Sequence, residues 1–164
     1  MSHRTITFIG LLLTALVMGV FWGTWFTLTR SLDMFEAPAF LRIGKTIIAN
    51  VAWPMRILMP ATLLFMGWSL ASHPVRRSPG FKLMVAATAL MVVTLLITLL
   101  VEVPIDNRIA EWTVDTIPTD WKDQRLTWDH FHTARTFTAI TSFASYLWAA
   151  SGIVSEANSL RQGR

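Results

Sequence analysis

The segment 5–29 contains no charged residue and reads TITFIGLLLTALVMGVFWGTWFTLT. About 20 mainly apolar residues are enough for a helix to cross the hydrocarbon core of a bilayer. Arg4 precedes the segment, as in a signal peptide, but the apolar run is too long for one and no small-residue cleavage site follows it. We therefore predict a membrane-spanning helix that stays in the mature protein, with Trp22, Trp25 and Phe26 in an interfacial aromatic belt.

Three more apolar stretches follow in the sequence. Residues 83–101 are aliphatic, Ala, Thr or Met, and a charged residue flanks each end. The stretch 57–71 is short for a span, so we expect its helix to begin earlier, with Pro54 at the first helical position and Pro60 inside it. Residues 31–51 are mixed in polarity and predict a short helix along the membrane interface. The predicted spans are about 5–29, 52–72, 82–102 and 130–154.

The composition supports a protein that lives in lipid. Charged residues make up 15% of the chain and apolar residues 53%, whereas soluble domains carry about 25% charged residues. A length of 164 residues favours one domain. The predicted fold class is all-α: an integral membrane four-helix bundle with antiparallel spans. Residues 1–164 form a single transmembrane domain, with a long polar loop between the third and fourth helices.

Several function classes find no support in the sequence. Cysteine is absent, which excludes disulfides, thiolate metal sites and cysteine catalysis. There is no glycine-rich phosphate loop and no serine nucleophile elbow. The net charge of +4 comes from scattered Lys and Arg, so we predict no nucleic-acid partner. The predicted partners are the lipid bilayer, a small aromatic or lipophilic ligand, and further copies or chains in a homo-oligomer or larger membrane complex.

Lys and Arg near the span ends indicate the orientation. One side would carry Arg4, Arg76, Arg77, Lys82, Arg161 and Arg164, and the other Arg30, Arg42, Lys45, Arg108, Lys122 and Arg125. The counts are equal, but the first group has a short basic loop and the second a long loop rich in acids. We predict a multi-pass protein of the cell membrane with both termini in the cytoplasm.

Ionisable residues gather at one end of the predicted bundle. Antiparallel spans bring together Arg30, Arg56, Glu102, Asp106, Asn107, Asp129, His130, His132 and Arg135. Charged groups in or near hydrocarbon are costly and usually mark a site or a paired network. This one-sided cluster is the main functional signal of the sequence.

The fourth span places three cluster residues on one helical face, because Trp128, His132 and Arg135 follow at i, i+4 and i+7. Asp129 either orients the His132 ring by accepting an N–H or caps the helix. Arg135 suits an anionic oxygen, and Glu102 is the expected counter-ion of Arg135 or of Arg56. The alternative is that Arg135 and Glu102 pair only to hold helices together.

A metal site is disfavoured by helix geometry. His130 and His132 would join Glu102 and Asp106 as ligand types suited to iron, zinc or copper, but residues i and i+2 on a helix point about 160° apart. We therefore predict no metal and no organic cofactor. Trp112, Trp121 and Trp128 are interpreted as membrane-interface anchors, or as a lid over an aromatic ligand if they line a cavity.

Two segments resemble the anthrone-oxygenase-like family of small four-helix membrane proteins, long catalogued as a domain of unknown function. They are 102–112, EVPIDNRIAEW, and 120–136, DWKDQRLTWDHFHTART. The family pattern is a Pro-x-Asn element ending helix three, then a Trp, then Trp-x-x-x-His-x-x-Arg-Thr opening helix four. Trp128, His132, Arg135 and Thr136 match the second element. Pro104 and Asn107 approximate the first, with Asp106 where the Asn is expected.

The resemblance implies a fold and a reaction. Fungal members oxidise anthrones to anthraquinones with dioxygen, without a flavin or haem. On that basis His132 would be the general base, Arg135 would stabilise the oxyanion, and Asn107 or Asp106 would hold a substrate hydroxyl. Two further functions stay open: a non-enzymatic accessory subunit or lipophile-binding protein without a ligand-sized cavity, and, ranked last, a small transporter.

Overall fold

The structure is a computed structural model that describes the backbone of residues 1–162 and the side chains of residues 1–152. The side chains of Arg161 and Arg164, which entered the topology prediction, lie outside the described residues. Within residues 1–162 the chain forms helices and no strand, so the predicted all-α class is confirmed. In order these are α1 (His3–Thr27), the 3-10 helix η1 (Thr29–Met34), α2 (Ala37–Ala71), α3 (Pro79–Ile97), the π-helix η2 (Thr98–Glu102), α4 (Val103–Glu111) and α5 (Trp121–Gln162).

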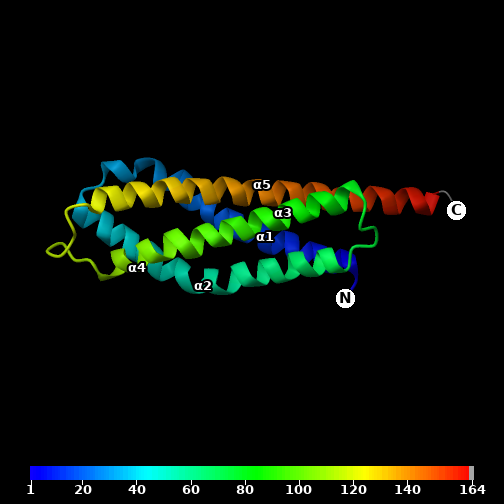
Figure 1. Cartoon of the computed structure of the whole chain (residues 1–164), viewed down its shortest axis with the longest axis horizontal. Coiled ribbons are helices and arrows are strands. Elements are labelled where there is room, and N and C mark those ends of the chain that lie inside the picture. The colour runs from blue at the N-terminus through cyan, green and yellow to red at the C-terminus, as the bar shows by residue number, and fades with distance from the viewer. Residues whose placement is uncertain (163–164) are drawn as a thin grey trace.

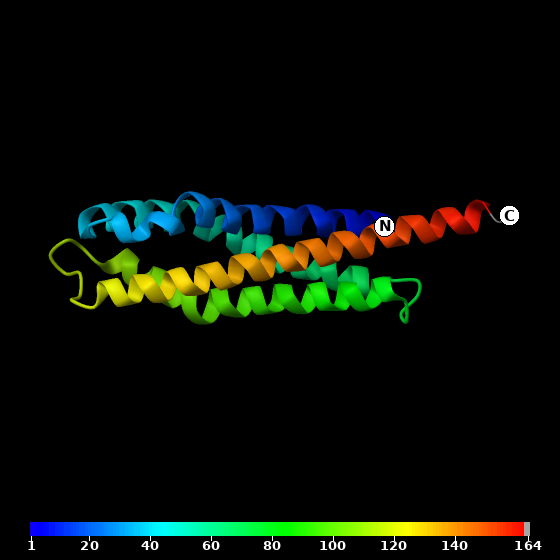
Figure 2. The ribbon, with the colours of Figure 1, turned by 90° about the horizontal axis from the view of Figure 1, so that it is seen from above.

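The helices form a bundle of long rods that lie side by side (Figures 1 and 2). α1, α2 and α5 are each one rod, and α3, η2 and α4 follow one another along a rod that we call the third rod. Both termini lie at the same end of the bundle, beside the turn between α2 and α3 (Figure 1). The loop 112–120 lies at the other end. α5 packs most extensively against α3, and α1 contacts both α2 and α5.

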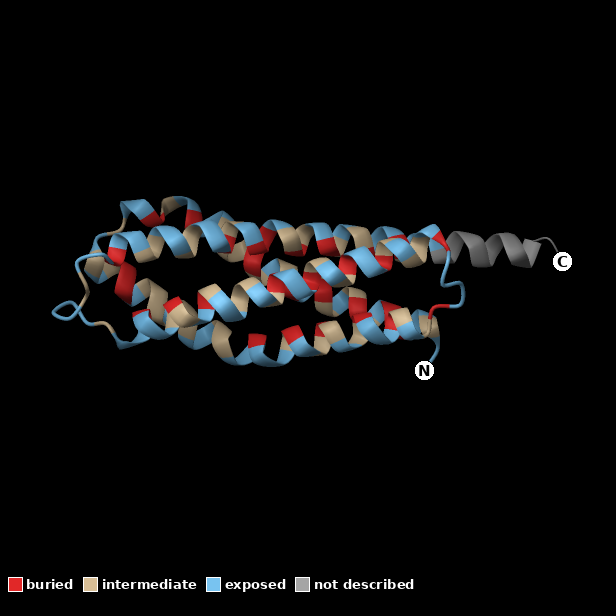
Figure 3. Cartoon of the chain, in the orientation of Figure 1, coloured by how far each residue is buried: buried red, intermediate tan, exposed pale blue. Residues whose placement is uncertain are grey.

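The outer surface of the bundle is apolar. Figure 3 shows exposed positions on the outward faces of the rods and buried positions between them, and large exposed side chains include Phe8, Leu12, Trp53, Leu100 and Trp148. So many exposed large apolar side chains fit lipid better than water.

Length and composition identify three candidate spans among the described residues: His3–Met34, Ala37–Ala71 and Pro79–Glu111. The chain is therefore a membrane protein. α5 does not meet the same criterion over its described part, so the predicted fourth span, 130–154, stays a prediction.

α2 is longer than predicted. It begins at Ala37, with a proline in its first turn, where the missing N–H costs no hydrogen bond. Within 31–51 the separate short helix is η1, which ends at Met34, and the remainder from Ala37 belongs to α2; the position of η1 at the membrane interface stays a prediction. Pro60 lies inside the helix as predicted, but so does Pro54. The helix changes direction along its length (Figure 1), as proline-containing helices do.

The third rod also continues beyond its predicted end. Glu102 does not terminate the helix: η2 leads directly into α4, which ends at Glu111. Pro104 cannot donate a hydrogen bond to the preceding turn, and the chain accommodates it with a wider π turn, in which the Val103 N–H reaches the Thr98 carbonyl. The connecting loop is consequently 112–120, far shorter than the predicted 103–129.

The core consists of two hydrophobic clusters, one above the other along the bundle axis. The larger contains Val17, Phe21 and a group of methionines, including Met55, Met59 and Met91. The smaller lies towards the loop 112–120 and contains Leu32, Phe40, Leu41, Ile105, Ile109 and Trp121. The ionisable residues lie where the two clusters meet.

Candidate functional site

Arg135 of α5 is the centre of a buried polar network. Its Nε and Nη2 atoms lie 3.1 and 2.8 Å from Nδ1 of His132, and Nη1 lies 3.4 Å from Oγ1 of Thr98. Nη2 is also 2.7 Å from Oε2 of Glu102, and the guanidinium carbon stands 4.6 Å from the Phe21 ring centroid. These contacts connect α5 to α1 and to the third rod.

Glu102 supplies the negative charge of this network. Its side chain is 0% exposed, and the predicted ion pair with Arg135 is confirmed. Neither carboxylate oxygen forms a hydrogen bond of ordinary geometry among the described residues, so the contact is a charge pair. The π turn is the local cause of its position: it contains one residue more than an α turn and so changes the face on which side chains lie.

The His132 ring is held by Arg135. The predicted partner, Asp129, forms no hydrogen bond with it in the described structure. A guanidinium only donates hydrogen bonds, so Nδ1 of His132 must keep its lone pair, and a neutral ring then carries its proton on Nε2. Nε2 is buried beside the backbone of Phe21, without a hydrogen bond of ordinary geometry. The ring therefore has no free lone pair with which to act as a base.

Trp128 connects the network to a second carboxylate. Its indole stacks on the His132 ring, with centroids 4.6 Å apart and planes 5° apart, which confirms that the two residues share a helical face. Its Nε1–H donates to Oδ1 of Asp106 at 3.0 Å. The second carboxylate oxygen, Oδ2, makes no hydrogen bond to the described residues. Asp106 occupies the position of the Asn in the Pro-x-Asn pattern. One of its carboxylate oxygens is held by Trp128.

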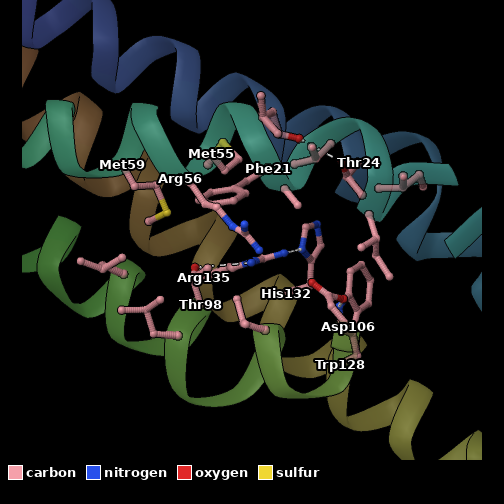
Figure 4. A pocket seen from close by; sticks show the side chains of 18 of the residues that line it. Phe21, Thr24, Met55, Arg56, Met59, Thr98, Asp106, Trp128, His132 and Arg135 are labelled. Carbon is pink, nitrogen blue, oxygen red and sulfur yellow. Dashed lines mark hydrogen bonds between the residues drawn. The ribbon is translucent and has the colours of Figure 1, made fainter. Parts of the chain in front are cut away.

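A cavity of about 340 Å³ lies beside these groups. Figure 4 shows Asp106, Trp128, His132 and Arg135 along one wall. The rest of the wall is largely apolar and comes from α1, α2 and the third rod: Val20, Phe21, Ile47, Ile48, Val51, Ala52, Met55, Met59, Pro60, Leu95, Leu99 and Val103, with the polar Thr24, Arg56, Thr98 and Asn107 among them.

Other predicted residues do not join the site. Asp129 is half-buried and does not line the cavity. Burial raises the pKa of its carboxyl, while the neighbouring His130 and Arg125 lower it. His130 is exposed, whereas His132 is buried. Among the described residues there is no group of three or more His, Asp or Glu side chains placed to hold a metal ion. Arg30 lies outside the site, over the Phe26 ring.

The three tryptophans near the loop differ in their surroundings. Trp128 lines the cavity, whereas Trp121 is buried against Phe40, with Arg125 over its ring. Trp112 packs beside the smaller hydrophobic cluster. A common lid of three rings is therefore wrong. Sequence reasoning missed Phe21 and Thr98, whose part in the site depends on helix packing and on the π turn and leaves no signal in the residue pattern.

The chain matches one protein family over most of the site. A family model described as anthrone oxygenase matches residues 46–145, more than half of the chain. The matched region includes Arg56, Asp106, Trp128, His132 and Arg135, while α1 precedes it. No curated protein and no solved structure matches the chain.

Proposed function

Because the chain belongs to the anthrone oxygenase family, we propose that it is a membrane enzyme that oxidises a flat, lipophilic phenolic substrate with dioxygen. The cavity is the observation that carries this proposal. Its volume of about 340 Å³ is within the range of small-molecule sites, and its apolar walls meet a wall that holds Asp106 and Arg135. An apolar ring system would bind there with one edge against charged groups.

The proposed reaction converts a benzylic CH₂ group of an anthrone-type substrate into a carbonyl. A base removes one proton from this carbon, and the resulting carbanion–enolate bonds to one atom of dioxygen. Protonation gives a hydroperoxide. Loss of the remaining proton on carbon and cleavage of the O–O bond then release water and leave a quinone. One dioxygen supplies both the new carbonyl oxygen and the water oxygen, so no other oxidant is needed.

Asp106 suits the role of the base better than His132 does. A general base needs a free lone pair within reach of the substrate proton, and Oδ2 of Asp106 is free on the cavity wall while Oδ1 accepts from Trp128. Arg135 would stabilise the negative charge that develops on the substrate oxygen, because it borders an apolar and largely enclosed space. His132 then acts as a positioning residue that fixes the guanidinium.

The non-enzymatic alternative has one observation in its favour. Arg135 already contacts Glu102, His132 and Thr98, as in a network that only holds helices together. A lipophile-binding protein or an accessory subunit of a larger complex would need no more. The cavity argues against a purely structural role, and turnover separates the two functions.

We propose an orientation from the basic residues at the two ends of the bundle. Both termini lie at one end of the bundle (Figure 1). Arg4 in the first turn of α1 and Lys82 in the first turn of α3 lie at that end, so the proposed topology in the cell membrane has both termini in the cytoplasm. The cavity then lies towards the outer half of the bundle.

The test measures oxygen uptake and quinone absorbance with 1,8-dihydroxyanthrone, for protein in lipid nanodiscs against protein-free nanodiscs. We expect Asp106→Asn to lower kcat by about 10²- to 10⁴-fold, the usual contribution of a general base. Asp129→Asn is the matched control, since it makes the same change outside the cavity, and should keep near-normal turnover. A wild-type rate equal to that of empty nanodiscs would favour the non-enzymatic function.

A further inference from the structure

Arg56 is a cation on the cavity wall that takes no part in the network around Arg135. It lies well inside α2, between Met55 and Met59, 15 residues before the helix ends at Ala71. Within the described residues it forms no ion pair and no cation–π contact. Its side chain extends from α2 into the cavity (Figure 4). An unpaired charge at this depth is costly in lipid, which indicates that an anion completes it.

The same residue stands at the mouth of the cavity. Among the lining residues, the exposed ones are Arg56 and Pro60 on α2, and Leu99, Val103 and Asn107 on the third rod. The cavity therefore opens sideways, between α2 and the third rod, on a face of the bundle that a bilayer would cover. A lipophilic molecule dissolved in the membrane can reach this mouth without passing through water.

We propose that Arg56 binds an acidic group of the ligand, so that the site takes an amphiphilic aromatic acid from the membrane. The acidic group is a carboxylate or an ionised phenol, which a guanidinium holds with two parallel hydrogen bonds. This inference rests on the proposed function and specifies its substrate class.

The charges of the cavity fix the direction of such a ligand. Asp106 repels an acidic group, Arg135 is already paired with Glu102, and the unpaired Arg56 attracts the acid, so the acid stays at the mouth. The far edge of the aromatic body then reaches the wall that holds Asp106 and Arg135. Attraction at one end with repulsion at the other discriminates between the two orientations more strongly than attraction alone. Arg56 would thereby decide which carbon of the substrate meets the base.

The test is equilibrium binding of two matched probes, anthraquinone-2-carboxylate and its neutral carboxamide, by calorimetry in phosphatidylcholine nanodiscs. Both probes are already quinones, so their affinities do not depend on turnover. We expect Arg56→Gln to weaken carboxylate binding about 10- to 100-fold, the usual effect of losing a hydrogen bond between charged groups, and to leave carboxamide binding unchanged. Arg56→Lys should recover part of the loss. Arg42→Gln, an exposed position on the same helix outside the cavity, should change neither affinity.

Three outcomes would overturn the inference. Equal weakening of both probes by Arg56→Gln would mean that the residue only shapes the cavity. No weakening of either would mean that it does not contact the ligand. A carboxylate preference that disappears in nanodiscs of phosphatidylglycerol would assign Arg56 to a lipid headgroup. A failed turnover test with a positive binding result would remove the oxygenase function and leave the acid site.

Discussion

Among the described residues, one buried polar cluster lies near the termini and another lies where the two hydrophobic clusters meet, and only the second borders the cavity. The cavity cluster consists of Glu102, His132, Arg135 and Thr98 and carries a full ion pair. The terminal cluster lies near the two termini and joins α1, α2 and α5 through Thr7, Ser69, His3, Ser72, His73 and Tyr146. Its hydrogen bonds join neutral groups: Thr7 to Ser69 at 2.6 Å and His3 to Ser72 at 2.9 Å.

The difference shows what marks a candidate site in this fold. Both clusters are buried, and both contain histidine. In the terminal cluster, however, side chains fill the space: His3 and His73 meet edge to face at 5.3 Å, and Tyr146 is 0% exposed. In the cavity cluster Arg135 borders an open space of ligand size, and its partner Glu102 is buried behind it. The buried polar groups of the terminal cluster thus serve packing. The cavity cluster is the candidate site because a charged side chain borders a cavity there.

The largest expected effect on stability is at the ion pair. Glu102→Gln leaves the Arg135 charge buried without compensation, which usually costs about 3–5 kcal/mol. Unfolding in mixed micelles should show this loss. The double variant Glu102→Leu, Arg135→Leu should recover most of the stability, because apolar side chains replace both charges, yet it should remain inactive. Recovery of turnover in the double variant would show that the ion pair is purely structural. Both clusters would then serve packing alone.

The next effect tests the close packing of the terminal cluster. A Cβ atom on Gly10 would lie 2.6 Å from the Tyr146 hydroxyl, and the buried ring has little room to move. We expect Gly10→Ala to cost about 1–3 kcal/mol, the usual cost of overpacking. Gly19→Ala is the matched control on the same helix, with open space around its Cβ. Equal stability of the two variants would show that the terminal cluster is loosely packed.

A smaller effect follows from the hydroxyl pair. Ser69→Ala removes the partner of the Thr7 hydroxyl, so we expect a loss of about 1 kcal/mol in the free energy of unfolding. Turnover of 1,8-dihydroxyanthrone should be unaffected, since the residue is remote from the cavity. A large loss of activity in this well-folded variant would assign function to the terminal cluster as well.

The smallest expected effect belongs to Thr98, whose hydroxyl lies 3.4 Å from Arg135. Thr98→Val keeps the shape of the side chain and removes this long hydrogen bond, together with the bond that the hydroxyl donates to the Thr94 carbonyl at 2.9 Å. A bond of the second kind, to the carbonyl four residues earlier in a helix, adds little to stability. We expect it to cost less than about 1 kcal/mol of stability. The unfolding midpoint should scarcely move. A severe loss would show that the π turn depends on this hydroxyl.

The sequence predicts the architecture better than the ends of its elements. A charge-free segment such as 5–29 has few alternatives to a membrane helix. The sequence predicts boundaries at Glu102, the charge that ends an apolar run, and at Pro54, because a proline at the first helical position loses no hydrogen bond. In this bundle, a buried partner compensates Glu102, and Pro54 lies inside α2. Such compensation depends on neighbouring helices and is invisible along the chain.

The sequence predicts several residues of the candidate site but not which of them contact one another. His132 has Asp129 three residues before it and Arg135 three residues after it, and helical spacing treats the two alike. Packing decides between them, because α5 turns Arg135 towards Glu102 and leaves Asp129 half-exposed. The cavity itself arises from gaps among several helices, so Arg56 gave no signal beyond being a charge in an apolar helix.

The geometry of the site depends on the number of residues in the π turn at Thr98–Glu102. Deleting one residue there would return the third rod to a continuous α-helix, and α4 would rotate by about 100° relative to α3. Asp106 would then leave the cavity wall, although every side chain of the site was still encoded. The extra residue sets the rotation of α4 about its axis relative to α3, and so determines whether Asp106 lies on the cavity wall. Chain length within this turn therefore constrains the protein as strongly as the identity of any polar residue.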